Sequence, residues 1–437
     1  MNYIFQRRFL TFIFSLSLFV LSSEKSWAQA ASPYSRYGLG YVRSSVFSAN
    51  KGMGGIAAPY ASALNINFTN PASYASLTRT TLEIGMNIDG VSIATNDSVY
   101  RTGNGSISHL AIAFVPNPRR NNWAISAGLL PYSNINYNFI QNFNDTASVG
   151  SYREIFTGSG SLYQAYVGGA YKVKGFSVGA NAGYLFGKLD YQKLITFADS
   201  ADSYATRNNS SMNVKSFVYS VGVQYQKQIY TNPENPDERH KIFMTLGVYG
   251  SSGMKMNAKL SNYWERLNII SDVGVVMVDT IAATFNKKDK VNLPFNLGVG
   301  AMFGNERYWM IGADFKFMNW QNFSSPLSNS TLNSSWRVSL GMQITPKLDD
   351  RKYLNRVQYR LGGYYGKSEI AYQGNQLSEA AGTFGLGIPF KAAGRLNISG
   401  EIGTRGGSDK SIIRENFYRF TFGLVINDIW FIKRKFD

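Results

Sequence analysis

The chain has 437 residues and a net charge of +17, with 44% hydrophobic residues, only 16% charged residues and no cysteine. So many apolar and aromatic residues exclude intrinsic disorder, and the missing cysteines exclude a disulfide scaffold and a cysteine-ligated zinc site. Beyond residue 28, no segment offers about 18 consecutive apolar residues, which disfavours a helical membrane protein. Low charge, 15% aromatic residues and 42 glycines are typical of a transmembrane β-barrel, where only alternate residues of a strand face lipid.

Residues 1–28 have the pattern of a secretory signal peptide. Arg7 and Arg8 supply the positive start, and an apolar stretch follows from Phe9 to Leu21. Ser26-Trp27-Ala28 then offers small residues at the two positions that determine cleavage. We therefore expect an exported protein from which residues 1–28 are removed.

Residues 29–79 lack sustained alternation and instead carry turn chemistry. The stretch contains Gly52-Met53-Gly54-Gly55 and, further on, Asn70-Pro71-Ala72. Proline fixes its own φ and restricts Asn70 to extended geometry. Roughly fifty residues without low-complexity character are better explained as a compact insert than as a linker. We predict an N-terminal hatch, or plug, over residues 29–79, whose position these two motifs help to fix.

From about residue 80 onward, apolar and polar residues alternate in steps of two. Between Phe176 and Phe186, for example, every second residue is apolar, and serine, glycine and asparagine stand between them. A soluble β-sandwich would alternate too, but the rich apolar face and the glycine-rich polar face favour a closed barrel. We predict an all-β fold, an antiparallel transmembrane barrel over residues 80–426. It has about 14 strands, which begin near Leu82, Gly105, Asn122, Gly158, Phe176, Ser211, Lys241, Lys290, Arg307, Asn333, Arg356, Ser378, Gly394 and Arg414.

The connections between these strands alternate in length. Short connections are typical of the periplasmic side of an outer-membrane barrel, and long ones of the external side. Long loops are expected near 139–157, 197–210, 263–289 and 322–332. This pattern predicts a Gram-negative outer-membrane protein with both termini in the periplasm and a basic periplasmic tail over residues 427–437. Trp123, Trp309, Trp320 and Trp336 are expected in the interfacial girdles.

The order of the motifs resembles a known family. Gly52 to Ala57 reads GMGGIA and is followed by Asn70-Pro71-Ala72-Ser73, and Leu293-Pro294-Phe295 and Gly385 to Phe390 come later. This set resembles the long-chain fatty acid transporter (FadL-like) outer-membrane proteins. The resemblance implies a barrel of fourteen strands, plugged by a hatch with an Asn-Pro-Ala motif. The ending, from Trp430 to Asp437, is more similar to a divergent branch that includes accessory barrels of outer-membrane protein machines.

The sequence offers little catalytic or metal-binding chemistry. Only two histidines are present, His109 and His240, and there is no cysteine. Barrel hydrolases usually need a histidine as general base. His109 is better explained as a structural residue, and isolated histidines make a metal site improbable. We therefore predict a protein that is not an enzyme and uses no cofactor.

The candidate functional residues are polar side chains that strand parity directs into the lumen. They can form a network that fills the barrel and braces the hatch, or a conduit whose cations meet an anionic head group. The set comprises Glu83, Asp89, Asp314, Lys316, Arg337, Arg356, Arg360, Glu401 and Arg405. The basic excess matches the phosphorylated lipids and lipopolysaccharide of an outer membrane. Because the chain has a signal peptide and a barrel pattern, nucleic acid is not an expected partner.

Two functions follow. The first is uptake of small hydrophobic or amphipathic, fatty-acid-like molecules through a hatch-gated barrel. The alternative is a non-transporting accessory subunit of an outer-membrane secretion or barrel-assembly complex. The basic C-terminal residues and the aromatic stretch at Tyr263 to Arg266, expected in a long loop, motivate this alternative.

Overall fold

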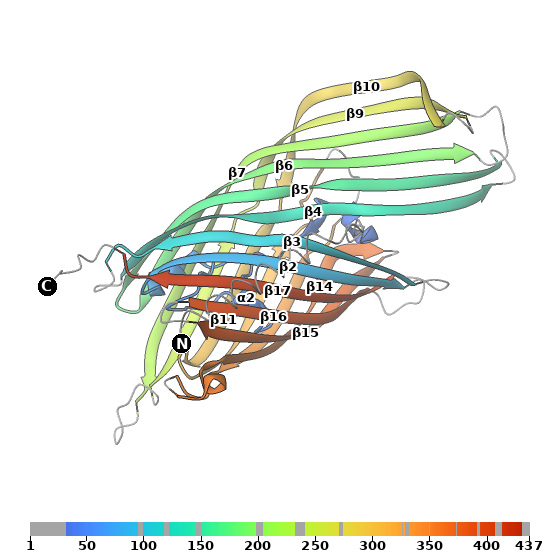
Figure 1. The fold of residues 1–437 in the computed structure, drawn as a ribbon. Coiled ribbons are helices and arrows are strands. Elements are labelled where there is room, and N and C mark those ends of the chain that lie inside the picture. The colour runs from blue at the N-terminus through green and yellow to red at the C-terminus, as the bar shows by residue number, and fades with distance from the viewer. Residues whose placement is uncertain are drawn as a thin grey trace, which may run out of the picture.

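The protein is a closed β-barrel that surrounds an N-terminal hatch (Figure 1). The computed structural model describes residues 32–94, 99–117, 122–145, 150–197, 204–231, 241–270, 274–325, 327, 332–348, 350–372, 374–390, 394–406 and 413–430. The predicted signal peptide, His240 and residues 431–437 of the predicted tail lie outside this set.

The hatch contains four short elements, η1 (Pro33–Arg36), β1 (Tyr41–Val42), α2 (Ser48–Lys51) and η2 (Pro71–Ser76). The wall contains β2 (Thr80–Ala94), β3 (Val99–Phe114), β4 (Trp123–Asp145), β5 (Gly150–Val173), β6 (Phe176–Phe197), β7 (Ala205–Tyr230), β8 (Ile242–Ser251), β9 (Met254–Ile270), β10 (Gly274–Leu293), β11 (Phe295–Asn305), β12 (Trp309–Asn319), β13 (Ser335–Ile344), β14 (Gln358–Tyr372), β15 (Asn375–Phe390), β16 (Gly394–Gly406) and β17 (Arg414–Asp428). A further turn, η4 (Tyr353–Arg356), precedes β14.

These elements form fourteen wall strands. β8 pairs with the second half of β7 and β9 with its first half, so β8 and β9 are one strand with a break at residues 252–253. β11 and β10 pair with β8 and β9 in turn and are likewise one strand, interrupted at Pro294, which has no N–H to donate. β17 pairs with β2 along its whole length and closes the barrel. The predicted antiparallel barrel of fourteen strands with a hatch is confirmed.

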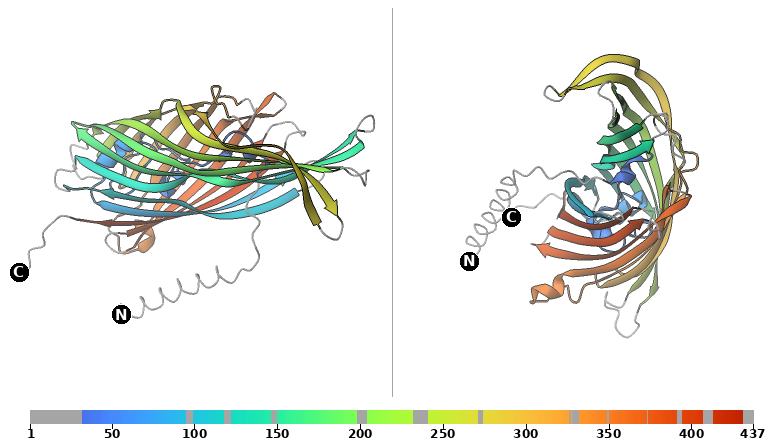
Figure 2. Two further views of the ribbon diagram at one scale, coloured as in Figure 1. Left: turned by 90° about the horizontal axis from the view of Figure 1, so that it is seen from above. Right: turned by 90° about the vertical axis from the view of Figure 1, so that its right-hand side faces the viewer.

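The hatch lies inside the ring of strands, as the blue segments in the right-hand view of Figure 2 show. Its apolar side chains pack against the wall in several clusters, of which two contain most of the large hatch side chains. Phe47, Ile66, Phe68, Tyr74 and Leu77 pack against β3, β4 and β5. Met53, Ile56 and Tyr60 pack against Met302 and Met310. None of the helices among the described residues has the length and apolar character needed to cross a membrane.

The wall strands differ greatly in length. β4, β5, β6 and β7 have 23, 24, 22 and 26 residues, whereas β12 and β13 have 11 and 10. A tilted strand crosses a bilayer with about 9–11 residues. β4 to β7, with β9 and β10, therefore form a sheet that continues beyond the other strands, at the end opposite the C-terminal end of β17 (Figure 1). We call this sheet the extension.

The extension corrects three expected loops. Most of 139–157, of 197–210 and of 263–289 belongs to β4–β5, β6–β7 and β9–β10. The aromatic stretch from Tyr263 to Arg266 is part of β9. These segments form strands without the alternation of a lipid-facing wall, because both of their faces lie outside the apolar belt. The fourth segment, 322–332, is not part of a long strand in its described residues.

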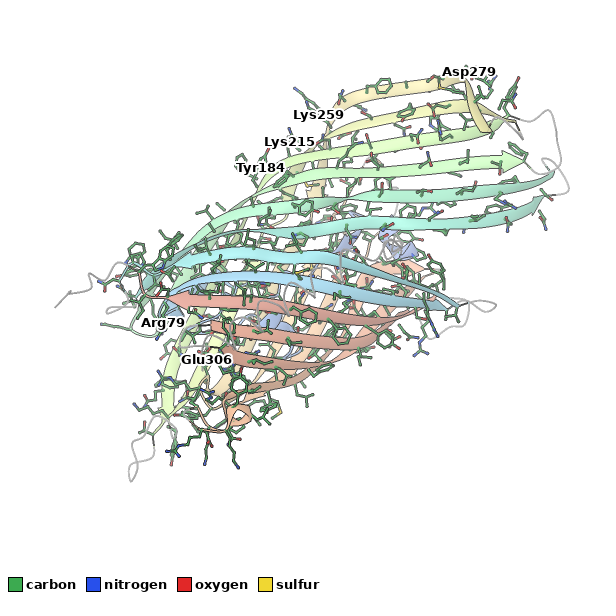
Figure 3. All side chains as sticks on the ribbon, in the orientation of Figure 1. Arg79, Tyr184, Lys215, Lys259, Asp279 and Glu306 are labelled. Carbon is green, nitrogen blue, oxygen red and sulfur yellow. The ribbon has the colours of Figure 1, made fainter. Side chains whose placement is uncertain are left out.

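The base of the extension is marked by a change in the outward face of β7. Phe217, Tyr219, Val221 and Val223 are exposed and apolar, whereas the next outward residue along the strand is Lys215. Figure 3 shows Tyr184, Lys215 and Lys259 on neighbouring strands at this level, and Asp279 far above them. This change is what the boundary of a hydrocarbon layer requires. Trp320 does not belong to an interfacial girdle, because it is 1% exposed and lies in a buried apolar cluster with Ile135 and Leu260.

The wall has a lateral gap between β3 and β4. In the described residues these two strands pair only between Leu110–Phe114 and Ile125–Leu129. The separation begins after Leu129, two residues before Pro131, and β4 has a β-bulge between Pro131 and Ser133. The bulge reverses the parity of the strand: Ile125 and Leu129 point outward, but Ile135 and Tyr137 point inward. A proline that cannot donate to the ladder thus stands two residues beyond the end of the ladder.

Candidate functional site: the hatch, the lumen and the lateral gap

The Gly52-Met53-Gly54-Gly55 motif contacts the backbone of the wall. Gly54 has a φ of +70°, and a β-carbon there would lie 2.7 Å from the carbonyl oxygens of Leu340 and Gly363. A β-carbon on Gly362 would in turn lie 2.4 Å from the Gly54 nitrogen. The Thr383 hydroxyl accepts a hydrogen bond from the Gly54 N–H at 2.8 Å. Only glycine permits this approach of two backbones, so the motif fixes the hatch against β13, β14 and β15.

The Asn70-Pro71-Ala72 motif fixes the opposite side of the hatch. Asn70 is extended, as the sequence predicted, and its side chain caps η2 by accepting from the Ala72 N–H at 3.2 Å. Its Nδ2 donates to the Ala58 carbonyl at 2.7 Å. Glycines of the wall leave room for this motif as well, because a β-carbon on Gly179 would lie 2.6 Å from the Pro71 carbonyl. Both hatch motifs are therefore anchors to the wall.

Buried acidic side chains of the wall bind the hatch backbone and its cations. Asp314 accepts from the N–H groups of Ala57 and Ala58 at 3.0 and 2.6 Å. Asp89 lies 2.6 Å from the guanidinium of Arg43. Lys51 donates to Asn87 at 2.9 Å, and burial lowers the pKa of Lys51 to about 8. Arg43 and Lys51 were not among the predicted residues, because the hatch has no periodicity from which a contact with the wall could be inferred.

Glu83 and His109 form a second buried contact beneath the hatch. His109 Nε2 lies 3.3 Å from a Glu83 oxygen, and the imidazole stacks on Phe47 with ring centres 3.7 Å apart. Glu83 also accepts from the Ile66 N–H at 3.3 Å. Both side chains are almost fully buried. The contacts support a structural role for His109.

Three of the remaining predicted side chains, Arg337 on β13 and Glu401 and Arg405 on β16, lie together with Glu379 of β15 and Arg419 of β17. Glu379 lies 3.1 Å from Arg405 and 3.6 Å from Arg337, and Arg419 lies 2.5 Å from Glu401. Glu379 was missed, although it stands directly opposite Arg405 in the β15–β16 register. Arg360 forms its own group, donating to Gln343, Gln358 and Asn397 at 2.6–2.9 Å.

Arg356 was predicted in this polar network and is not part of it. It lies in η4, the turn before β14, and its guanidinium stands 5.1 Å from the ring centre of Tyr353. The strand begins two residues later than the parity argument assumed. The prediction was wrong because periodicity does not mark where a turn ends.

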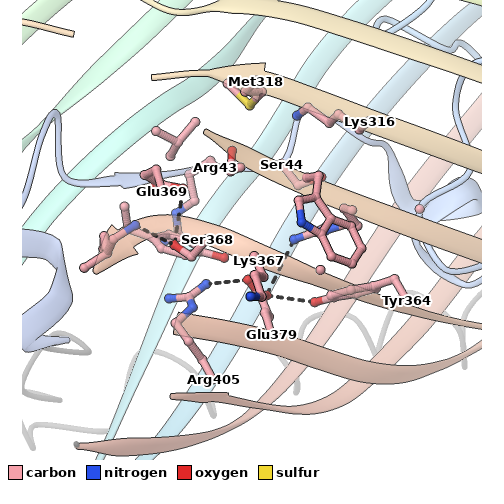
Figure 4. A pocket seen from close by; sticks show the side chains of 18 of the residues that line it. Arg43, Ser44, Lys316, Met318, Tyr364, Lys367, Ser368, Glu369, Glu379 and Arg405 are labelled. Atoms are coloured by element: carbon pink, nitrogen blue, oxygen red, sulfur yellow. Dashed lines mark hydrogen bonds and ion pairs between the residues drawn. The ribbon is translucent and has the colours of Figure 1, made fainter. Parts of the chain in front are cut away.

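A cavity of about 140 Å³ lies between this network and the hatch (Figure 4). Lys316 points into it, and within the described residues its ammonium group makes no hydrogen bond or ion pair. The charged lining residues are Arg43, Lys51, Lys316, Arg337, Lys367, Arg405, Arg419, Glu369, Glu379 and Glu401. Pockets for drug-sized ligands measure about 300–1,000 Å³ and are mostly apolar. This cavity is therefore too small and too charged to hold a long hydrocarbon.

A larger and more aromatic cavity lies at the lateral gap. It measures about 360 Å³ and is lined by η1, by the ends of β2 and β3, and by Tyr137–Gln141 of β4. Tyr34, Tyr37, Tyr100, Tyr137 and Phe139 contribute rings. Arg36 lies over the ring of Phe156, 3.9 Å from its centre.

The lumen filled by the hatch, the lateral gap and the apolar belt define a hatch-plugged barrel of the outer membrane. Residues 7–437 match the BamG family model, and the chain belongs to the BamG family. No curated protein matches it.

Solved structures share the fold at low sequence identity. A FadL homologue from Pseudomonas aeruginosa is 12% identical, with a TM-score of 0.59 over 90% of this chain and 99% of the other. The toluene transporter TodX from P. putida is 14% identical, with a TM-score of 0.55 over 89% and 100%. The toluene transporter TbuX from Ralstonia pickettii is 12% identical, with a TM-score of 0.52 over 87% and 98%. The predicted resemblance to FadL-like barrels is confirmed at the level of the fold.

Proposed function

We propose that this protein is a non-transporting accessory subunit of an outer-membrane secretion or barrel-assembly complex. The observation that carries the proposal is how closely the hatch fills the lumen. The hatch meets wall glycines backbone to backbone on opposite sides, and the remaining central cavity is about 140 Å³ and strongly charged. A fatty-acid-like molecule would find no apolar path there. Membership of the BamG family along almost the whole chain supports the same role.

The extension supports the proposal independently. Its strands are about twice as long as the 9–11 residues that cross a bilayer. A simple pore does not require a sheet of this size outside the membrane. With both termini in the periplasm, as we propose, it would face the exterior and could contact other outer-membrane proteins.

Depletion of the protein tests this role. We expect the amounts of other barrel proteins or surface-exposed proteins in the outer membrane to fall, while uptake of labelled oleate and toluene stays unchanged. A selective loss of uptake, with normal outer-membrane protein levels, would contradict the subunit role.

The second candidate is uptake of a small hydrophobic or amphipathic molecule, and the aromatic cavity at the gap favours it. That cavity lies apart from the charged central one, and Arg36 beside it could meet an anionic head group. The similar transporters named above lend it support through their fold. Native mass spectrometry of the gently extracted protein would detect a bound lipid-like ligand, and Phe139→Asp should abolish it. Repeated absence of any ligand would count against uptake.

A further inference from the structure

We propose that the outer edge of β4, from Tyr137 to Asn144, binds an extended segment of another polypeptide by β-strand addition. The inference rests on the proposed function and names the kind of partner that such a subunit would hold. Within the described residues, no strand pairs with this edge, because β3 leaves β4 at Leu129.

The edge already accepts extended backbone from the hatch. β1 pairs with Ser133 and Asn134, and the Arg43 N–H donates to the Tyr132 carbonyl at 2.8 Å. The Ser32 N–H donates to the Asn136 carbonyl at 3.1 Å. Even-numbered residues thus direct their backbone groups to the outer edge. Because strand geometry has a period of two, Asn138, Ile140, Asn142 and Asn144 present theirs next.

The two edges of the extension are built differently. The described outer edge of β10 has three register shifts and five charged residues, Asp279, Lys287, Lys288, Asp289 and Lys290. Bulges and charges are the usual protection of an edge against pairing. On β4, residues 135–144 read INYNFIQNFN, with no charge and with unbroken register against β5. The edge of β10 is thus protected against pairing, whereas the edge of β4 can pair with another strand.

The aromatic cavity explains how the edge could select its partner. The 360 Å³ space lies directly beside Tyr137–Gln141 and is also lined by η1. In strand addition, backbone hydrogen bonds supply affinity and pockets for alternate side chains supply specificity. The partner that fits is a strand with an unpaired edge and alternating aromatic residues, which is the pattern of an outer-membrane barrel strand.

A synthetic peptide that copies Arg414–Asp428 serves as the probe, because it has this alternation. Binding to the purified protein in detergent is followed by fluorescence anisotropy, and a photoreactive phenylalanine in place of Phe420 maps the contact. We expect adducts on Tyr137–Asn144 and on η1, and no binding of a scrambled peptide. Adducts on β2 or β16 would mean exchange into the peptide's own place in the wall and would overturn the proposal.

Matched variants separate backbone pairing from side-chain contact. The double variant Asn138→Pro/Asn142→Pro removes two edge N–H donors but leaves the ladder to β5, so binding should weaken at least about tenfold. Asn138→Ala/Asn142→Ala keeps both donors and should bind within about twofold. If the proline variant does not fold, judged by heat-modifiable migration, Asn138→Lys/Asn142→Lys gives the same comparison through edge charge. Equal binding by the wild type and the edge variants would overturn the proposal.

Co-purification of partners from native membranes is measured separately. A stoichiometric complex without peptide binding would remove this proposal and leave the subunit role. Peptide binding without any stoichiometric partner would remove the subunit role and leave the strand-addition proposal.

Discussion

The guanidinium of Arg43 in the hatch lies 2.6 Å from the carboxylate of Asp89 on β2, and both side chains are largely buried. This pair joins the chain just after β1 to the wall near the lateral gap. Breaking a buried pair by removing one partner leaves an unpaired charge, which typically costs about 3–5 kcal/mol.

We therefore expect Arg43→Met to lower the free energy of unfolding by an amount in that range. Arg43→Met/Asp89→Leu should recover most of the loss, because neither charge is then buried alone. Urea titration of the barrel in lipid vesicles measures both. Equal destabilisation by the single and double variants would show that the pair does not act as a unit.

Gly362→Ala tests the backbone contact between hatch and wall. Its β-carbon would lie 2.4 Å from the Gly54 nitrogen, and overpacking of this kind typically costs about 1–3 kcal/mol. Gly382→Ala is the matched control, because a β-carbon there meets nothing within 4 Å. We expect faster proteolysis of the hatch in the first variant only. Indistinguishable digestion of the two would contradict the sealed contact.

Lys51 predicts a pH dependence. Burial lowers the pKa of Lys51 in the folded protein to about 8, from the ordinary value of 10.5. Between these values the unfolded chain binds more protons, so stability should rise as the pH increases from about 8 to 10.5. In Lys51→Met this rise should shrink, while the barrel still folds. Denaturant midpoints at pH 7.5, 9 and 10.5 measure it, and the same rise in both proteins would exclude Lys51 as its source.

The orientation in the membrane can be tested with single cysteines, because the chain has none. Asp279 lies at the far end of the extension, opposite Arg79 and Glu306 (Figure 3). We expect Asp279→Cys to react with a membrane-impermeant maleimide on intact cells. Lys352→Cys, in the turn before η4, should react only after the outer membrane is permeabilised. The reverse pattern would invert the proposed topology.

The sequence predicted the wall well because lipid imposes a strict rule on it. Each of the fourteen predicted starts falls in or within a few residues of a separate wall strand, counting β8–β9 and β10–β11 once each. The rule stops at the base of the extension. In the residues of β7 that precede Lys215, neither face of the strand contacts lipid, so neither face has to be apolar. The segments that were expected to be loops there are strands.

The lumen was predictable only in part. Parity placed Glu83, Asp89, Asp314 and Arg405 inside the barrel, where the structure has them. Their hatch partners could not be predicted, since Arg43 and Lys51 reach the wall through turns without periodicity. The gap at Pro131 could have been suspected, because a proline inside a wall strand must lie at an edge or a bulge.

We propose that this hatch-plugged barrel works as part of a complex. Affinity purification of the tagged protein from native membranes in mild detergent, followed by native mass spectrometry, tests it most directly. We expect a stoichiometric assembly with at least one other outer-membrane protein and no lipid-like ligand in the lumen. A lone barrel that repeatedly retains such a ligand would contradict it.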